Sequence, residues 1–291
     1  MTEEIKTETH PEQETDKKST LRVIVHSFFV VPFLIALFAV IVYLMVRVLT
    51  SEPNDAQVYL EHVKTGGTTK RWQGAFELSK ILSNPALVPD DERFVQEMIS
   101  TFEYSSHEKD HRIRAYLALA MGRTRDERYS ETLIHSLQEK NASVVAAGAY
   151  ALGLIRSKDA LNDLIQIASH GDPHVRLQVI IALGNYEDER TTNILISALE
   201  DFEANVRWDA AVALAKLKKD NGRRILLDLL DRNYLDSFPN IDPIEQDQAM
   251  LVAIQVIHNI IDPEFEKVLL KLSENDRSMK VREAARKVLN I

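Results

Sequence analysis

Apolar and polar residues recur in a fixed pattern along most of this chain. The clearest unit runs from Ala204 to Lys216, ANVRWDAAVALAK, where apolar residues recur with the period of an α-helix. Aligned copies of its central part are Arg114 to Gly122, Val145 to Gly153, Arg176 to Gly184 and Arg207 to Ala215. The last residues of these four copies are spaced by 31. A constant period of this size predicts a solenoid of stacked repeats.

Each copy is followed by a second apolar pattern that obeys the same period. Leu133, Leu164, Leu195 and Leu226 mark it, again spaced by 31. A polar turn precedes each of these helices, and Asp-Glu-Arg recurs there at 91–93, 126–128 and 188–190. An acidic residue at a helix start caps free amides and suits the helix dipole. Weaker copies of the first pattern are Arg71 to Ser79, Met250 to His258 and Arg282 to Asn290. Residues 70–291 are therefore predicted to form paired helices, with no alternating strand.

Two steps of the period are longer than the others. The first adds residues around 84–90 and 104–110, and the second adds Asp231 to Gln246. Insertions in a solenoid project as loops. The second loop is acidic and holds the aromatic residues Tyr234 and Phe238, so a solvated loop, a partner-binding loop and a calcium site are its alternatives. It lacks the ligand spacing and central glycine of an EF-hand. We expect a short turn to replace it without loss of the fold.

The amino-terminal part has a different pattern. Residues 1–22 are rich in Glu, Thr and Lys and are expected to be a disordered tail. The next stretch, 23–49, holds no acidic residue and one basic residue, Arg47. At about 1.5 Å per residue it is long enough to be a transmembrane helix. Residues 50–69 are predicted to be a connector with a short helix, Ala56 to Val63.

A buried core helix or a cleaved signal peptide fits 23–49 less well. The stretch is apolar on all sides, exceeds the usual apolar region of a signal peptide, and has no Ala-x-Ala site after it. Lys17, Lys18 and Arg22 precede it, whereas Arg47 and Lys64 are the nearest basic residues after it. This bias predicts a single-pass membrane protein with a cytoplasmic amino terminus and the repeats on the other side. The lipid bilayer is then one expected partner.

Composition excludes several classes of function. The net charge is −9, so attraction to nucleic acid is not expected. Cysteine is absent, which removes disulfides, thiolate metal sites and cysteine nucleophiles. The nine histidines are scattered, and no two share one helix at the spacing of a zinc protease site. We therefore expect no metal, no cofactor and no catalytic residue.

The pattern Val-Arg-x-x-Ala-Ala-x-Ala-Leu-Gly, followed by a helix with paired leucines, resembles the HEAT repeat in its phycobilisome-lyase-like variety. The match is clearest at Asp172 to Gly184 and at Asn205 to Ala215, and it covers residues 70–291. The resemblance implies a right-handed α–α superhelix with the Val-Arg helices on the concave side. Members of the family mostly act as scaffolds and adaptors.

Enzymes also occur in this family. Deoxyhypusine hydroxylase holds two irons with several His-Glu pairs, whereas this chain has one adjacent pair, His107 and Glu108. The bilin lyases share their repeat signature with noncatalytic members, so the signature does not indicate lyase activity. HEAT-like DNA glycosylases use basic concave surfaces, which an acidic chain does not suggest. A membrane-held lyase or hydroxylase is the competing interpretation, and an anchored ligand-binding module is a third.

One repeat position is basic in most copies: Arg71, Arg114, Arg176, Arg207 and Arg282. A cation near a helix start opposes the dipole, so we expect each to pair with an acid of a turn, such as Asp172 or Glu203. A structural ladder explains the column better than ligand binding does.

The positions one and five residues after this arginine point away from the predicted core on a helical wheel. They are nevertheless apolar or aromatic, and an exposed apolar patch marks a contact surface. They form either a partner groove or packing between repeats. With the two aromatic residues of the inserted loop, the candidate partner-binding residues are Trp72, Phe76, Leu119, Tyr150, Leu177, Ile181, Trp208, Val212, Leu251, Tyr234 and Phe238. The sequence thus predicts a membrane-anchored, noncatalytic scaffold or adaptor that binds a protein partner in a membrane-associated complex.

Overall fold

The computed structural model describes residues 26–50, 55–260 and 262–291. The chain divides into two compact units, residues 1–53 and 54–291. The predicted disordered tail, residues 1–22, lies outside the described residues, as do 51–54 of the predicted connector.

In the first unit, a short π-helical turn, η1 (His26–Val30), leads into α2 (Val31–Thr50). Pro32 is the second residue of α2. A proline clashes with the carbonyl four residues earlier, and a π-helical turn at this junction is a usual way to accommodate it. Residues Phe28–Val46 have a mean hydropathy of 2.9, and none of the span is buried inside the structure. By length and composition this helix is able to cross a membrane.

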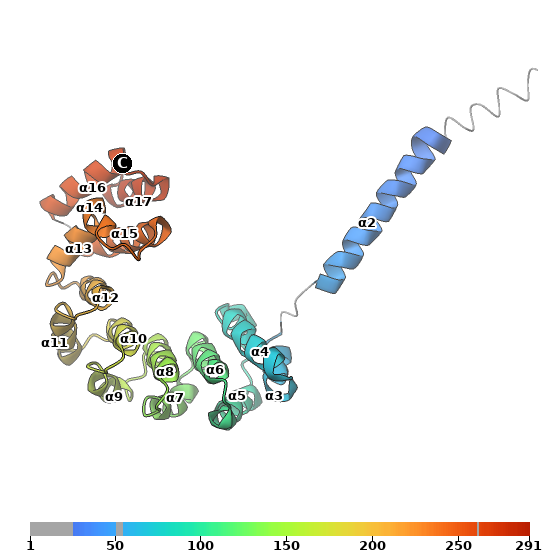
Figure 1. The fold of residues 1–291 in the computed structure, drawn as a ribbon, viewed down its shortest axis with the longest axis horizontal. Helices are drawn as coiled ribbons and strands as arrows, with labels where there is room; N and C mark the ends of the chain where they lie inside the picture. Colours follow the sequence, from blue (N-terminus) through green and yellow to red (C-terminus); the bar gives the residue numbers. More distant parts are fainter. Residues whose placement is uncertain (1–25, 51–54, 261) are drawn as a thin grey trace, which may run out of the picture. The chain divides into compact units, whose positions relative to one another are not determined.

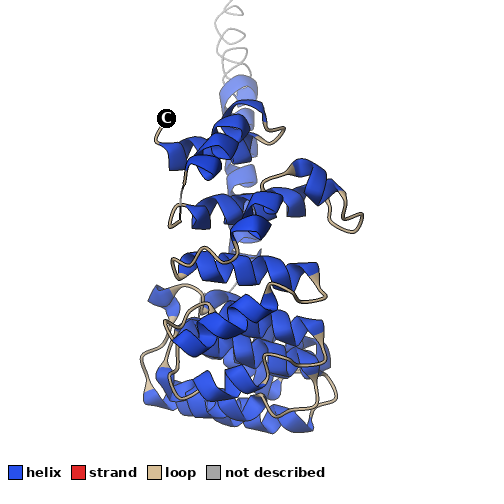
Figure 2. Cartoon of the chain, turned by 90° about the vertical axis from the view of Figure 1, so that its left-hand side faces the viewer, coloured by secondary structure: helices blue, strands red, loops and turns tan. Residues whose placement is uncertain are grey.

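The second unit is built from helices, and no strand occurs among the residues that the structure describes (Figure 2). All seven copies of the sequence pattern are helical, and we call these the signature helices: α4 (Thr68–Ile81), α6 (His111–Thr124), α8 (Ala142–Ile155), α10 (Pro173–Leu183), α12 (Ala204–Lys216), α15 (Pro243–Ile257) and α17 (Met279–Leu289). The helices between them are α5 (Glu92–Tyr104), α7 (Ser130–Ser136), α9 (Leu161–Gln166), α11 (Glu189–Ala198), α13 (Arg223–Leu229) and α16 (Pro263–Asn275).

The signature helices lie side by side along an arc (Figure 1). Within this unit, α6, α8, α10 and α12 line the inner side, and α5, α7, α9 and α11 form the outer row. The short connector helix, α3 (Ala56–Thr65), packs against α4. The first long step of the period is filled by two 3₁₀ turns, η2 (Pro85–Leu87) and η3 (Ser105–His107).

Acidic or amide side chains cap most of these helices, as the turns of the sequence predict. Each of the Asp-Glu-Arg turns has an aspartate that accepts a hydrogen bond from the amide two residues later, at distances of 2.8–3.0 Å: Asp91, Asp126 and Asp188. Asn141 caps α8 and Asp172 caps α10 in the same way. Such caps satisfy amides that have no partner within the helix.

Close helix packing explains the glycine that ends three of the clearest copies. A Cβ atom on Gly153 would lie 2.5 Å from the Cα atom of Ala182, and one on Gly184 would lie 2.7 Å from the Cβ atom of Ala213. Signature helices therefore approach one another through glycine on one side and alanine on the next. This small-residue contact repeats once per period, which explains the Ala-Leu-Gly ending.

The apolar core consists of two clusters that meet at α12. Val206, Ala210 and Leu214 belong to the cluster that runs back to α3. Trp208 and Val212 belong to the cluster that continues through α17. One helix thus joins a regular stack of repeats to a less regular one.

The inserted segment 231–246 is part of this second cluster, so the expectation of a dispensable, solvated loop is wrong. It forms a short helix, α14 (Arg232–Asp236), and begins α15. Leu235 is fully buried, and Arg232 donates to Asp276 at 2.7 and 3.0 Å. Periodicity revealed the extra length but not these contacts, because they join residues far apart in the sequence.

Candidate functional site

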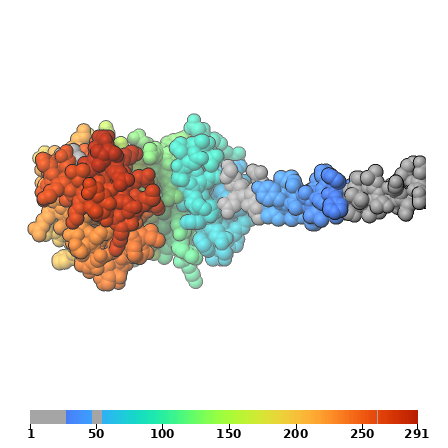
Figure 3. Space-filling model, turned by 90° about the horizontal axis from the view of Figure 1, so that it is seen from above, coloured from blue at the N-terminus to red at the C-terminus, as the bar shows by residue number. Residues whose placement is uncertain are grey.

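Side chains that are 31 residues apart lie on successive signature helices. On α6, α8 and α10 these sets line one groove with a volume of about 830 Å³. Its rows are Arg112, Ser143 and His174, then Tyr116, Ala147 and Gln178, then Leu119, Tyr150 and Ile181. Viewed from above, the green middle repeats lie between the cyan amino-terminal and red carboxyl-terminal helices (Figure 3).

The groove has an aromatic and basic end at α6. The Arg112 guanidinium lies 4.7 Å from the centre of the Trp72 ring and pairs with Asp110 at 2.7 Å. The rings of Phe76 and Tyr116 meet edge to face with centres 5.3 Å apart. A cation over a ring and a T-shaped ring pair are both attractive arrangements. Trp72 and Phe76 of α4 therefore pack against two residues that line the groove.

The second arginine of this end, Arg123, also lines the groove. It donates to the carbonyl oxygen of Ser79 at the end of α4. Among the described residues no carboxylate lies within 4.0 Å of its guanidinium, so within that part of the chain its charge has no ion-pair partner.

Three of the predicted partner-binding residues line the groove directly: Leu119, Tyr150 and Ile181. Trp72 and Phe76 adjoin it through the contacts described above. Leu177 and Leu251 are half-buried and pack against the two core clusters. The predicted apolar column therefore lines a groove at some repeats and packs between repeats at others.

Trp208 and Val212 are not on an exposed surface, which corrects the expectation for that repeat. Trp208 is 8% exposed and Val212 is 5% exposed. The Trp208 indole donates to the Tyr234 hydroxyl at 3.1 Å, and its ring centre lies 5.1 Å from that of Phe238. The inserted segment supplies both rings, so it covers the column at α12. Tyr234 and Phe238 are themselves half-buried in this cluster.

Several groove residues were missed by the sequence reasoning. Tyr116 and Gln178 lie two residues after the repeat arginine position, and Arg112 and His174 lie two residues before it. On a helical wheel the first of these positions is about 60° from the nearer of the two positions that make up the predicted apolar column. A wider sector of the helical wheel would have included Tyr116 and Gln178.

The row of Tyr116, Ala147 and Gln178 continues on α12 with Asp209, which is 31 residues after Gln178. Asp209 is half-buried. Burial raises its pKa, and Lys216, two helical turns later on α12, acts weakly in the opposite direction. Among the described residues no donor or cation forms a hydrogen bond or ion pair with its carboxylate. The row therefore ends on a desolvated acid without a partner.

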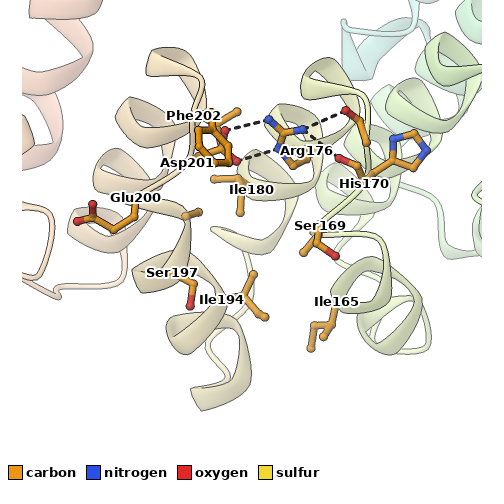
Figure 4. Close-up of a pocket in the computed structure, with 14 residues that line it drawn as sticks. Ile165, Ser169, His170, Arg176, Ile180, Ile194, Ser197, Glu200, Asp201 and Phe202 are labelled. Atoms are coloured by element: carbon orange, nitrogen blue, oxygen red, sulfur yellow. Dashed lines mark hydrogen bonds and ion pairs between the residues drawn. The ribbon is translucent and has the colours of Figure 1, made fainter.

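The arginine column forms a structural ladder, although with other partners than those expected. Arg176 pairs with Asp201 at 2.8 and 2.9 Å and donates to the carbonyl oxygen of His170 at 3.0 Å (Figure 4). Asp172 instead caps α10, and Glu203 precedes α12. The side chain thus bridges the turn before its own helix and the turn of the next repeat.

Arg114 repeats this arrangement with Glu139 at 2.7 Å. Arg207 and Arg282 reach the carbonyl oxygens of the preceding turn, at Asp201 and Asp276. A pocket of about 450 Å³ below the Arg176 pair is lined by apolar residues such as Ile165 and Ile194 (Figure 4). The ladder satisfies carbonyl groups at helix ends, so its role is structural.

No group of three or more His, Asp or Glu side chains that could hold a metal occurs in the described parts of the chain. The inserted segment, the one place where calcium was an alternative, instead uses Arg232 between Asp247 and Asp276. Burial alone would raise the pKa of Asp276, but hydrogen bonds from Arg232 and the Ser278 amide lower it overall.

Comparisons with known proteins agree with the repeat pattern. The family of HEAT repeats matches residues 161–236, so the chain contains HEAT repeats. No curated protein matches the sequence.

Among solved structures, the complex of CpcE and CpcF of phycocyanin lyase from Nostoc sp. PCC7120 superimposes with a TM-score of 0.56. The identity is 17%, over 82% of this chain and 96% of that one. YibA of Escherichia coli gives 0.49 at 17% identity, over 85% of each chain. Human deoxyhypusine hydroxylase gives 0.34 at 16%, over 81% of this chain and 94% of that one. The first similarity shows a HEAT-like solenoid fold.

Proposed function

We propose that this chain is a membrane-anchored HEAT-repeat scaffold or adaptor that binds a protein partner in the groove of α6, α8 and α10. The observation that carries the proposal is the groove itself, where equivalent positions of three repeats present accessible apolar and aromatic side chains. The repeats keep this surface continuous, which suits an extended partner. The right-handed superhelical path implied by the resemblance is part of the proposal.

The anchor in this proposal is the apolar helix α2. Its exposed apolar side chains, such as Phe33, Phe38 and Tyr43, would face lipid. The basic residues before position 23 favour an amino terminus in the cytoplasm and repeats on the other side. A reporter enzyme fused after Ile291 is expected to be active outside the cytoplasm, and activity inside it would reverse this orientation.

We propose a noncatalytic role because the side chains that line the groove are suited to binding. Tyr116, Tyr150 and Gln178 supply hydrogen bonds, and Leu119 and Ile181 supply apolar contact. No lysine or glutamate lines it, and its one carboxylate, Asp110, is paired with Arg112. An anchored module for a small ligand is the second candidate, since the groove has the size of a ligand pocket.

A photo-reactive amino acid placed at Tyr150 in the full chain, in native membranes, tests the function. We expect cross-links to one protein partner, and none when the same group replaces Gln166, which is exposed on α9. Ile181→Gln should reduce the cross-linked yield by about tenfold, the effect of losing a buried apolar anchor.

The matched control is Ile196→Gln, because Ile196 is a partly exposed isoleucine on the outer helix α11. It should leave the yield unchanged. Equal losses for Ile181→Gln and Ile196→Gln would overturn the groove as the binding surface. A thermal shift with a soluble small molecule, without any cross-linked protein, would favour the second candidate instead.

A further inference from the structure

The lining of the groove of α6, α8 and α10 combines aromatic rings with small side chains. Tyr116 on α6 has Ala147 as its equivalent on α8, and one helical turn later Leu119 on α6 has Tyr150 as its equivalent on α8. The ring of Phe76 on α4 packs edge to face against Tyr116. The rings thus border positions where an alanine leaves space, a shape suited to compact apolar side chains that recur regularly.

Three polar side chains of this lining can donate hydrogen bonds to a partner. The hydroxyl groups of Tyr116 and Tyr150 and the amide of Gln178 form no hydrogen bond with any other described residue. All three side chains are half-buried. They belong to α6, α8 and α10, so each signature helix of the groove supplies one such donor.

Two side-chain acceptors of the lining are already occupied. Asp110 accepts hydrogen bonds from the backbone amide and the guanidinium of Arg112. The amide oxygen of Asn141 accepts from two backbone amides at the start of α8. An unpaired N–H group of a partner would be costly at such a surface, whereas a carbonyl oxygen would find a donor. A proline-rich backbone has this property, because proline has no N–H group and the polyproline II helix has no internal hydrogen bonds.

The spacing of the groove also matches the period of a polyproline II helix. The close glycine contacts at Gly122 and Gly153 keep α6, α8 and α10 at even intervals, and neighbouring packed helices lie roughly 8–10 Å apart. A polyproline II helix has about three residues per turn and rises about 3.1 Å per residue, so it presents every third side chain on one side at intervals of about 9 Å. One turn of such a segment therefore corresponds to one repeat.

Other backbone conformations fit this groove less well. In an extended strand, side chains on one face recur at about 7 Å, and the described residues contain no sheet edge that could pair with its N–H groups. In an α-helix, residues seven apart recur at about 10.5 Å, but the carbonyl oxygens are bonded within the helix. The donors of the groove would then stay unused.

We infer that the groove binds a proline-rich segment of the partner protein in the polyproline II conformation, with every third residue over Leu119, Tyr150 and Ile181 in turn. This inference rests on the proposed function and gives its partner a composition and a conformation. The tyrosine rings pack against the proline rings, as aromatic-lined grooves do with such segments. Tyr116, Tyr150 and Gln178 donate to the carbonyl oxygens of the segment. Contact with all three helices takes about seven residues.

The test is a selection of displayed random peptides, about twelve residues long so that they exceed the groove, on the full chain held in lipid nanodiscs. We expect enriched peptides to contain proline and to carry an apolar residue at every third position. Enrichment of peptides without proline, of peptides with the apolar spacing of an amphipathic α-helix, or of no peptide would overturn the inference.

A register test then uses one enriched peptide. Insertion of a single proline between its first two apolar anchors turns the later anchors by about 120° and should weaken binding by about tenfold. Insertion of three prolines adds one full turn, close to one helix spacing, and should leave the affinity within about threefold. Equal losses for the two insertions would exclude a period of three residues and with it the polyproline II conformation.

The donors are tested on the protein itself. Tyr150→Phe keeps the ring and removes the hydroxyl, so the same peptide should bind about fivefold more weakly, the effect of one net hydrogen bond. The matched control is Tyr104→Phe, because Tyr104 is an exposed tyrosine on α5, outside the groove, and it should leave the affinity unchanged. Thermal unfolding confirms that both variants are folded. Equal affinities of the two variants would refute Tyr150 as a donor to the segment.

The inference and the proposed function fail in different ways. When the partner cross-linked through position 150 is identified, the cross-linked segment should be rich in proline. A cross-link to a segment without proline would remove this inference and leave the proposed function standing. Absence of any cross-linked protein would remove both.

Discussion

The repeats from α4 to α12 and those from α12 to α17 are built from one sequence pattern but use it differently. In the first region the position after the repeat arginine is half-buried at α4, where Trp72 lies under Arg112 beside an accessible groove. In the second region the same position is Trp208, which is buried beneath Tyr234 and Phe238. An insertion of a few turns thus buries a tryptophan whose equivalent on α4 is only half-buried.

The two regions also differ in how their helices are held together. The first uses glycine against alanine, once per period, from α6 to α12. The second uses ring contacts and a network in which Arg232 joins Asp247 and Asp276. Close packing of small residues keeps the spacing regular, whereas bulky rings and ion pairs permit an irregular step.

The largest effect that would test this comparison is expected at the two tryptophans. Trp208→Ala should cost about 3–5 kcal/mol of stability, because it empties a buried site. Trp72→Ala, at the same repeat position, should cost clearly less because that ring is only half-buried. Thermal unfolding of the full chain in detergent micelles measures both, and equal losses would mean that the inserted segment does not cover Trp208.

A smaller effect is expected from the glycine contacts of the first region. Gly153→Val places its Cβ atom 2.5 Å from the Cα atom of Ala182, too close for ordinary packing, and overpacking of this kind commonly costs about 1–3 kcal/mol. Gly171→Ala is the control, since nothing lies within 4 Å of the added atom. Chemical denaturation compares them, and a Gly153→Val protein as stable as the control would disprove the close helix approach.

The smallest effect concerns Asp209. Since burial raises its pKa, the folded protein holds this proton more tightly than the unfolded chain, and the charged form weakens the fold as pH rises above the unfolded value. Asp209→Asn should therefore raise stability at pH 7 by less than about 1 kcal/mol. The gain should vanish near pH 3, where the acid is protonated in both states. Melting curves of both proteins at the two pH values measure this gain. A loss of stability at pH 7 would mean that the Asp209 carboxylate makes a favourable interaction in the folded protein.

Much of the fold was predictable because it depends on local pattern. The signature helices from α6 to α12 repeat every 31 residues, with glycine ending three of these copies, so the same short-range physics recurs at each of them. The groove was partly predictable for the same reason: Leu119, Tyr150 and Ile181 are equivalent positions of successive helices. Tyr116 and Gln178 were missed because the wheel was divided too narrowly.

The sequence by itself determined the period, the helical class and an apolar amino-terminal stretch able to cross a membrane, since all three follow from the spacing of residues near one another in the chain. Only the tertiary structure decided that Trp208 is core and Trp72 is not, and that Arg176 pairs with Asp201 instead of Asp172. Burial and ion pairing depend on which distant segments meet. In this chain the segment 231–246, which packs against α12, is an insertion that has no equivalent in the other repeats. Comparison of the repeat copies therefore could not predict this contact.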